Sequence, residues 1–212
     1  MPDEQIAVWG IGTPRTLRAH WILAEFGIDY DCHPITSRSG ETMTPEFLAL
    51  NPKHKIPVLQ HGGNVLTESA AIVTYVSEAF AAPPDFHVPT DAVDRAKLNE
   101  WCFFIMTELD ALSLYVIRKH QDLHAIYGEA PGAIEAAKNN FSDLTGALFD
   151  GAGGNQEFLL PEGLSVADIL LTTCIQSAQR RGIEMPGYLV EFNDRMSRRP
   201  AFQKALAINN PG

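Results

Sequence analysis

The residues best suited to chemistry lie at 51–59 and at 66–72. Ile56-Pro57 stands at the head of an apolar strand, where proline is otherwise rare because it cannot donate to the ladder. X-Pro is also the only bond at which a cis peptide costs little. Such a proline leaves the amide and the carbonyl of Ile56 free to pair with an extended ligand backbone, as in strand addition.

Glu68-Ser69 marks the start of a helix a few residues later. A helix N-terminus attracts a carboxylate through its free amides and its dipole, and Glu68 can accept an ammonium beside it. Together with the free backbone of Ile56, these groups predict a site for a small zwitterionic peptide.

These residues resemble the glutathione site of the cytosolic glutathione transferases, and the resemblance covers nearly the whole chain. It implies that glutathione binds as a co-substrate and that no metal takes part. The residues implied in glutathione binding are His54, Lys55, Ile56, Pro57, Glu68 and Ser69.

The resemblance also implies a role for each of these residues. Ile56 would pair with the cysteinyl backbone of glutathione, while Glu68 and Ser69 would hold the γ-glutamyl end. His54 or Lys55, just before the Ile-Pro step, would supply a cation for the glycine carboxylate.

The reaction implied is attack of the glutathione thiolate on a hydrophobic electrophile. A free thiol with a pKa of about 8.5 is mostly protonated at neutral pH, so the protein must stabilise the thiolate. A hydroxyl donor and a helix N-terminus can do so. Members of the family place a tyrosine, serine or cysteine near the end of the first strand or the start of the first helix.

Counting back from Gly27 puts the serine position on Thr13, the tyrosine position on Trp9 and the cysteine position near Arg15. None of the three usual catalytic residues is therefore plainly present. Thr13 is our first candidate for the thiolate donor, and helix capping alone is its alternative role. Arg15, which could supply positive charge, and Thr16 are the other catalytic candidates.

The second, hydrophobic substrate would lie between the domains, against a long helix. The candidate residues there are Phe103, Phe104, Thr107 and Tyr115. Packing in a core or in a dimer interface is the alternative for each of them.

The pattern of the first part of the chain predicts the elements that hold these groups. An apolar strand at 6–9 leads into a helix with Thr13 as its N-cap, Pro14 at its first position and Gly27 at its end. The elements predicted after it are a strand at 28–35, a weak helix or loop at 41–51, a hairpin of 56–60 and 64–67, and a helix at 69–80. This order matches an α/β thioredoxin-like fold.

The proline-rich stretch 82–90 predicts a linker. It would separate a thioredoxin-like, glutathione-binding domain at 1–81 from an all-α C-terminal domain at 91–212, as in the glutathione transferase fold. Within the second domain we expect one long helix or a kinked pair at 91–124, a helix at 133–149, and a flexible loop at 151–154.

Ser165 and Asp168 form a capping box, and Leu164 and Ile169 form a hydrophobic staple around it. This combination resembles the folding signature of the family's buried sixth helix. We expect its role to be structural.

Composition narrows the class of protein. With 16 basic and 26 acidic residues the formal net charge is −10, which argues against sequence-independent binding to nucleic acid. Three widely spaced cysteines without a CxxC pair predict a reduced, intracellular protein. No signal peptide or membrane anchor is visible. We expect a cytoplasmic protein, and the resemblance implies a homodimer that serves detoxification.

Two other motifs are weak. Gly10-x-Gly12 suggests a dinucleotide site, but Arg15 replaces the third glycine. His120 and His124 have metal-ligand spacing on a helix, but no third ligand accompanies them.

Two rivals to a transferase remain. One is a glutathione-dependent disulfide reductase or peroxidase, since some relatives without a catalytic tyrosine or cysteine work in that way. The other is a non-catalytic glutathione-binding or ligand-binding scaffold on the same fold. The missing catalytic residue favours the scaffold, whereas the intact glutathione-binding residues disfavour it.

Overall fold

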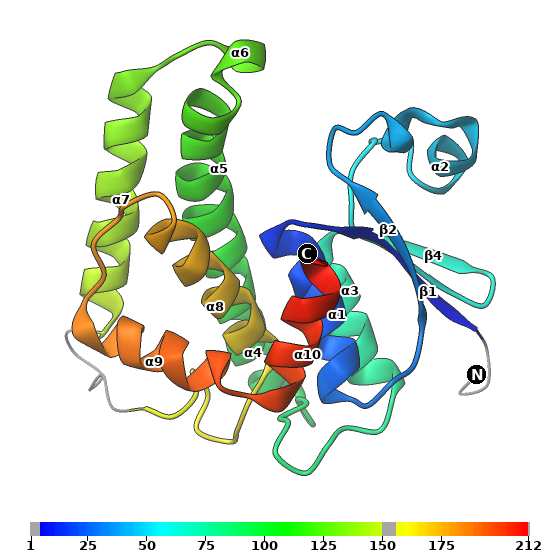
Figure 1. The fold of residues 1–212 in the computed structure, drawn as a ribbon. Helices are drawn as coiled ribbons and strands as arrows, with labels where there is room; N and C mark the ends of the chain where they lie inside the picture. The colour runs from blue at the N-terminus through cyan, green and yellow to red at the C-terminus, as the bar shows by residue number, and fades with distance from the viewer. Residues whose placement is uncertain (1–4, 150–155, 212) are drawn as a thin grey trace. The chain divides into compact units, whose positions relative to one another are not determined.

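The computed structural model of the chain describes residues 5–149 and 156–211 (Figure 1). The chain divides into two compact units. Unit 1 comprises residues 1–88 and 196–212, and unit 2 comprises residues 89–195.

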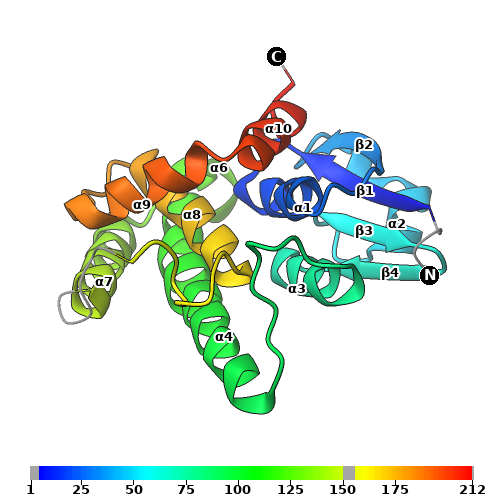
Figure 2. The same ribbon diagram turned by 90° about the horizontal axis from the view of Figure 1, so that it is seen from below.

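Unit 1 is built around a four-stranded sheet. Its elements in chain order are β1 (Ile6–Ile11), α1 (Pro14–Glu25), β2 (Asp31–Thr36), the short helix η1 (Glu41–Met43), α2 (Pro45–Leu50), β3 (Val58–His61), β4 (Asn64–Thr67), α3 (Ser69–Ala79) and α10 (Pro200–Asn209). The strand order is β2-β1-β3-β4, which Figure 2 shows from one edge to the other. β1 runs parallel to β2 and antiparallel to β3, and β3 is antiparallel to β4. The predicted thioredoxin-like fold is confirmed.

Different helices cover the two faces of this sheet (Figure 1). Val8 and Leu59 are paired across β1 and β3, fully buried, and face α1 and α3. The face toward α2 carries a smaller hydrophobic cluster. Its members are Phe47, Ile56, Val58, Trp9 and Ile35. The sheet is therefore buried on both sides near the end at which the Ile56–Pro57 step enters β3.

Two strand starts in unit 1 differ from the predicted ones. β2 begins at Asp31 rather than at residue 28, because Gly27 turns the chain with a φ of 63° and the Ile28 amide bonds back to Leu23. β3 begins at Val58 rather than at residue 56. The region 41–51 forms the short helices η1 and α2.

The C-terminal segment 196–212 belongs to unit 1, although the prediction placed it in the all-α domain 91–212. α10 packs against α1. At its start Arg199 donates to both Glu25 carboxylate oxygens, at 2.7 and 3.0 Å, and to Asp85 at 2.7 Å. The division at 82–90 itself stays a prediction.

Unit 2 is helical. Its elements are α4 (Ala92–Phe104), the π-helical segment η2 (Ile105–Leu114), α5 (Tyr115–Ile117), the π-helical segment η3 (Arg118–Asp122), α6 (His124–Tyr127), α7 (Pro131–Phe149), α8 (Val166–Gln179) and α9 (Gly187–Ser197), which ends two residues into unit 1. The first predicted helix is thus largely π-helical from Ile105 onward. The predicted loop 151–154 lies outside the described residues.

The predicted capping box is present at the start of α8. The Ser165 amide and hydroxyl donate to Asp168 Oδ2 at 2.8 and 2.6 Å, and the Leu159 amide donates to Oδ1 at 2.8 Å. Leu164 and Ile169 are both fully buried. Burial raises the pKa of Asp168 to about 6, although the three donors favour the charged form.

We expect Asp168→Asn to lower the free energy of unfolding by about 2 kcal/mol, because an amide nitrogen would face donors inside the core. Urea unfolding at pH 7.5 measures this loss. Asp143→Asn, at an exposed position on α7, is the control. A loss no larger than that of the control would contradict the role of the box.

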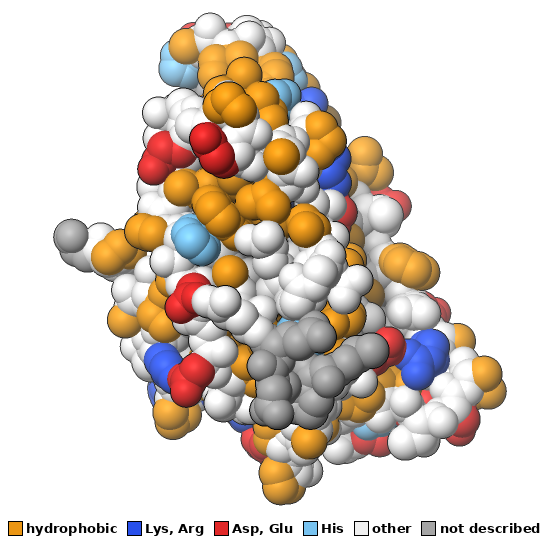
Figure 3. Space-filling view, turned by 90° about the vertical axis from the view of Figure 1, so that its right-hand side faces the viewer, with side chains coloured by type: hydrophobic (Ala, Val, Ile, Leu, Met, Phe, Trp, Pro, Cys, Tyr) orange, Lys and Arg blue, Asp and Glu red, His pale blue; other side chains and the backbone are white. Residues whose placement is uncertain are grey.

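No helix in the described parts of the chain is long and apolar enough to cross a membrane. The face seen in Figure 3 carries Lys and Arg side chains only in scattered positions, among hydrophobic and acidic ones. This pattern agrees with the net charge of −10.

Candidate functional site

Three predicted parts of the site meet at one end of the sheet of unit 1. Val58 of β3 pairs with Trp9 of β1 on one side and with Thr67 of β4 on the other. The groups that come next at this end are the turn from β1 into α1, the Ile56-Pro57 step and Glu68. The strand register therefore gathers groups that lie far apart in the sequence.

Gly10 permits the close approach of two of these parts. Its φ is +118°, and a Cβ atom built on it would lie 2.5 Å from the Cβ atom of Ile56. A real side chain at this position would collide with Ile56. In the sequence Gly10 stands out only as part of a weak dinucleotide motif, whereas in the fold it lets Ile56 pack against the end of β1.

The Ile56-Pro57 peptide bond is cis. The Ile56 side chain is 9% exposed and belongs to the cluster under α2. Ladder pairing of β3 with β1 and β4 begins at Val58. The backbone of Ile56 thus lies beyond the paired part of the strand, as a strand-adding ligand requires.

Asn51 holds the loop that precedes this step. It is 1% exposed, and its Nδ2 donates to the carbonyl of Lys55 at 2.7 Å. Its Oδ1 accepts from the Lys53 amide at 3.1 Å, and its carbonyl accepts from the His54 amide at 3.1 Å. His54 and Lys55 are exposed on this loop. Asn51 begins the predicted stretch 51–59, but the sequence assigned it no role, although an asparagine before Pro52 is a turn signal.

The start of α3 is open to solvent on one side. Glu68 is the N-cap residue, has a φ of 68° and makes no capping bond with its side chain. The Glu68 side chain is 70% exposed and pairs with Lys53 Nζ at 2.5 Å. Lys53 Nζ also donates to Thr67 Oγ1 at 2.9 Å. An ammonium group therefore already occupies the position that we predicted for the ammonium of a ligand.

Ser69, the first residue of α3, is buried at 4% exposure. Its Oγ accepts from Arg18 Nη1 at 3.1 Å, and Arg18 is itself 1% exposed. Because the Ser69 hydroxyl oxygen accepts a hydrogen bond from Arg18, the hydroxyl proton of Ser69 is available to another acceptor. Arg18, which the sequence did not single out, adds buried positive charge beneath the start of α3.

The start of α1 carries the three catalytic candidates. Thr13 Oγ1 accepts from the Thr16 amide at 3.0 Å, and Thr16 Oγ1 accepts from the Thr13 amide at 2.9 Å. Capping uses a lone pair of Thr13 Oγ1, and its proton, which has Thr16 Oγ1 3.0 Å away as an acceptor, can turn toward a ligand instead. Thr13 and Arg15 are half-buried, whereas Thr16 is fully buried and its hydroxyl donates to Asn209 Oδ1 at 2.6 Å. Of the two threonines, Thr13 is the better placed to reach a ligand.

His20 fixes the end of β1 from beneath. It is fully buried, with Nε2 3.0 Å from the carbonyl of Gly10 and Nδ1 2.7 Å from the hydroxyl of Tyr30. A carbonyl can only accept, so the proton is on Nε2 and Nδ1 accepts from Tyr30. Burial lowers the pKa of His20, and the hydrogen bond to Gly10 opposes this only in part.

This lowered pKa predicts a loss of stability in mild acid. Above pH 6.5 His20 is neutral in the folded and in the unfolded chain. Below pH 6.5 His20 takes up a proton in the unfolded chain but not in the folded chain. We expect the free energy of unfolding to fall by up to about 1.4 kcal/mol per pH unit from 6.5 down to the lowered pKa. Urea unfolding of wild type and His20→Gln between pH 7.5 and 4.5 measures this.

The exposed His124→Gln variant is the control for this experiment. His20→Gln should have a shallower pH dependence than wild type, while the control should follow wild type. Parallel curves for wild type and His20→Gln would contradict the prediction.

The four hydrophobic-substrate candidates lie in unit 2. Phe103 is 65% exposed, and Thr107, one turn further on, is exposed with its hydroxyl bonded to the Phe103 carbonyl at 2.8 Å. Phe104 packs edge-on against Trp101, with ring centroids 6.4 Å apart. Their role in substrate binding stays a prediction.

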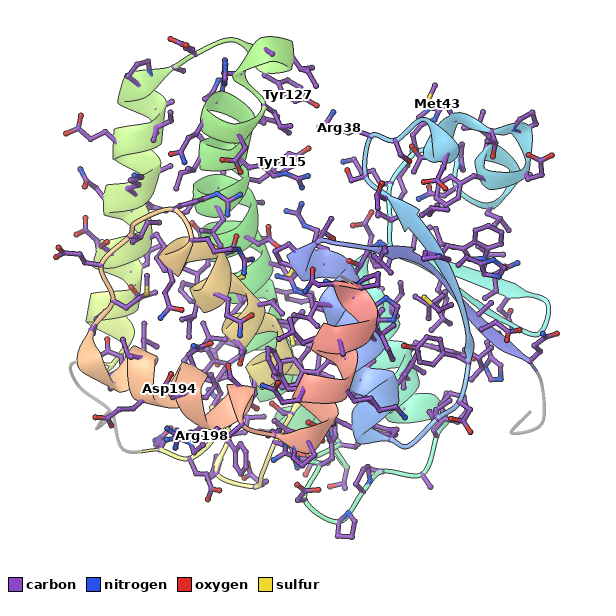
Figure 4. All side chains as sticks on the ribbon, viewed as in Figure 1. Arg38, Met43, Tyr115, Tyr127, Asp194 and Arg198 are labelled. Atoms are coloured by element: carbon purple, nitrogen blue, oxygen red, sulfur yellow. The ribbon has the colours of Figure 1, made fainter. Side chains whose placement is uncertain are left out.

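Tyr115, the fourth candidate, is half-buried. Lys119 Nζ lies 5.1 Å from the ring centroid of Tyr115 and 5.5 Å from that of Tyr127; Figure 4 labels both rings. Tyr115 is therefore part of a cation–π cluster at this end of the helix.

His120 and His124 contact backbone carbonyls. Their Nδ1 atoms lie 2.9 Å from the Gly128 oxygen and 3.0 Å from the Gln121 oxygen. Within residues 5–149 and 156–211, no three His, Cys, Asp or Glu side chains gather as a metal site would require.

Comparison with known proteins agrees with this geometry. Residues 4–78 match the family model described as "Glutathione S-transferase, N-terminal domain". The chain is 30% identical to the probable maleylacetoacetate isomerase 1 of Drosophila melanogaster, over 92% of this chain and 78% of that protein. It is 27% identical to the glutathione S-transferase-like protein gedE of Aspergillus terreus, over 97% and 96% of the two chains.

Among solved structures, the theta class glutathione S-transferase of Xanthomonas axonopodis pv. citri, with glutathione bound, superimposes with a TM-score of 0.79. It is 26% identical, and the match covers 96% of this chain and 97% of that one. The sheet, the arrangement of helices and these similarities agree, and the chain belongs to the cytosolic glutathione transferase superfamily.

Proposed function

We propose that this chain is a glutathione S-transferase that joins the glutathione thiolate to a hydrophobic electrophile. The observation that carries the proposal is the meeting of the Thr13-capped start of α1, the unpaired backbone of Ile56 and the start of α3 at one end of the sheet. The bound glutathione in the similar theta class structure supports it.

Glutathione would bind as an added strand. The amide and carbonyl of Ile56 pair with its cysteinyl residue. The γ-glutamyl ammonium displaces Lys53 from Glu68, which is feasible because an exposed ion pair contributes at most about 1 kcal/mol. The γ-glutamyl carboxylate accepts from Ser69 and from the free amides at the start of α3.

The glycine end would lie over the loop that Asn51 holds. His54 and Lys55 are exposed there and supply the cation for the glycine carboxylate. Pro57 gives the loop its direction into β3. A fixed loop favours binding, because less conformational entropy is lost when the ligand arrives.

Thr13 would stabilise the thiolate by donating its hydroxyl proton to the sulfur, with help from the dipole at the start of α1. Arg15, in the first turn of this helix, adds positive charge. The thiol proton passes to water when the thiolate forms. The sulfur then forms a bond to the electrophilic carbon, and the leaving group departs with its electron pair. Within the same proposal, Phe103, Phe104, Thr107 and Tyr115 bind the electrophile, and the protein is a cytoplasmic homodimer in detoxification.

The experiment that tests this function is calorimetry with glutathione, combined with the thiolate absorbance of the complex against pH. We expect binding and a thiol pKa clearly below the free value of about 8.5. Binding with an unshifted thiol would point instead to disulfide exchange or to a non-catalytic scaffold. Absence of binding at millimolar glutathione would overturn the site assignment and leave only the family and the fold.

A further inference from the structure

A buried residue at the end of α10 bonds to the start of α1. Asn209, the last residue of α10, is 2% exposed. Its carbonyl accepts from the Gly12 amide at 2.8 Å, and its Nδ2 donates to the carbonyl of Thr13 at 3.3 Å. Its Oδ1 accepts from Thr16 Oγ1 at 2.6 Å. These three bonds hold the turn from β1 into α1 at Gly12, Thr13 and Thr16.

The bond to Thr16 has a direct effect on the Thr13 hydroxyl. Thr16 Oγ1 lies 3.0 Å from Thr13 Oγ1 and also accepts from the Thr13 amide. A threonine side chain has few rotamers, and the bond to Asn209, together with the bonds to the Thr13 amide and carbonyl, holds the one that keeps Thr16 Oγ1 in this place. The position of Thr13 Oγ1 is thereby defined on its inner side, while its proton can turn outward.

We propose that Asn209 is a positioning residue for the thiolate donor, Thr13; this inference rests on the proposed function. A hydrogen bond to sulfur weakens steeply when its geometry changes, so the donor must be held before the thiol ionises. Without Asn209 the turn loses its side-chain anchors, and the Thr16 hydroxyl keeps only its bonds to Thr13, with the Thr13 carbonyl 2.8 Å away as the remaining acceptor for its proton. The peptide backbone and the two ends of glutathione are held elsewhere, by Ile56 and by the start of α3. The loss of Asn209 should therefore change thiol ionisation more than affinity.

The variant that tests this is Asn209→Leu, which keeps the branched shape of the side chain and the backbone bond to Gly12 but removes the side-chain hydrogen bonds. Two quantities are measured: the pKa of bound glutathione from its thiolate absorbance, and the affinity for S-methylglutathione, which has no thiol. We expect the bound thiol pKa to rise by about one unit, a tenfold loss of thiolate. The affinity for S-methylglutathione should stay within about twofold.

The neighbouring Asn210→Ala variant is the control. Asn210 is exposed, and its side chain bonds the carbonyl of Leu206 at 3.4 Å. The bound thiol pKa of this variant should equal that of wild type.

Thr16→Val removes the same bond from its other end, together with the bonds of Thr16 Oγ1 to the Thr13 amide and carbonyl, and it carries the test if Asn209→Leu does not fold. The double variant should raise the thiol pKa no further than Thr16→Val alone. If the variants lower only the melting temperature and leave the thiol pKa at its wild-type value, Asn209 is a structural anchor and the proposal is wrong. If wild type binds glutathione without a lowered thiol pKa, the proposed transferase function is wrong. This outcome differs from failure of the Asn209 proposal alone, in which wild type lowers the thiol pKa and the variants do so equally.

Discussion

Turnover of Thr13→Ala is expected to fall about 100-fold, while affinity for glutathione changes by less than about threefold. Removal of one preorganised donor to a developing or bound anion typically costs two to three orders of magnitude in rate. Thr13 Oγ1 accepts from the Thr16 amide, so the variant also loses a helix cap, and stability should fall by about 1 kcal/mol. Steady-state kinetics with a chromogenic electrophile, calorimetry and urea unfolding measure the three effects.

Asp91→Ala separates the loss of a cap from the loss of the donor. Asp91 caps α4 by accepting from the amides of Val93 and Asp94 at 2.8 and 2.9 Å. This variant should lose a similar amount of stability and retain turnover. Thr13→Ser, which keeps the hydroxyl, should restore most of the activity. If Thr13→Ala turns over at the wild-type rate, Thr13 is only a cap, and Arg15 becomes the leading catalytic candidate.

Gly10→Ala is expected to lower the free energy of unfolding by about 4 kcal/mol and to abolish glutathione binding at millimolar concentration. Overpacking costs about 1–3 kcal/mol, and a left-handed backbone conformation costs a side chain about 1–2 kcal/mol more. Here the new Cβ atom would lie 2.5 Å from Ile56 Cβ and 2.9 Å from Ile56 Cγ2. Ile56 must move, and its backbone is the part of the site that pairs with the ligand. Urea unfolding and calorimetry measure the two losses.

Gly12→Ala is a matched control in the same turn. Gly12 has a φ of +81°, but a Cβ atom built on it meets nothing within 4 Å. The free energy of unfolding of the control should therefore fall only by the cost of a side chain at positive φ, about 1–2 kcal/mol, and the control should keep glutathione binding. Equal losses in the two variants would show that backbone conformation, rather than the contact with Ile56, accounts for the effect.

Local sequence signals predicted most of the elements. Thr13 and Pro14 fix the start of α1, and Ser165 and Asp168 fix the start of α8, because a cap depends only on residues three positions apart. The π-helical turns of η2 were not predictable in this way. Apolar spacing there fits an ordinary helix, and the wider turns are accompanied by side-chain bonds such as that from Ser113 to the Glu108 carbonyl at 2.9 Å.

The sequence by itself determined the types of group available to the site: a helix-capping hydroxyl at Thr13, an X-Pro step at Ile56, and an acidic and hydroxyl pair at Glu68 and Ser69. Each is a short motif with its own physical signature. These groups meet at one end of the sheet once its strands are arranged in the order of the thioredoxin-like fold.

Only the tertiary structure decided how these groups are held. Gly10 must lack a side chain because Ile56, 46 positions later in the chain, packs against it. Arg18 bonds Ser69, 51 residues away, and Thr16 bonds Asn209, 193 residues away. Side chains that meet through folding leave no periodicity or spacing in the sequence, because nothing local requires them. The residues that support the candidate site were therefore visible only in the folded chain.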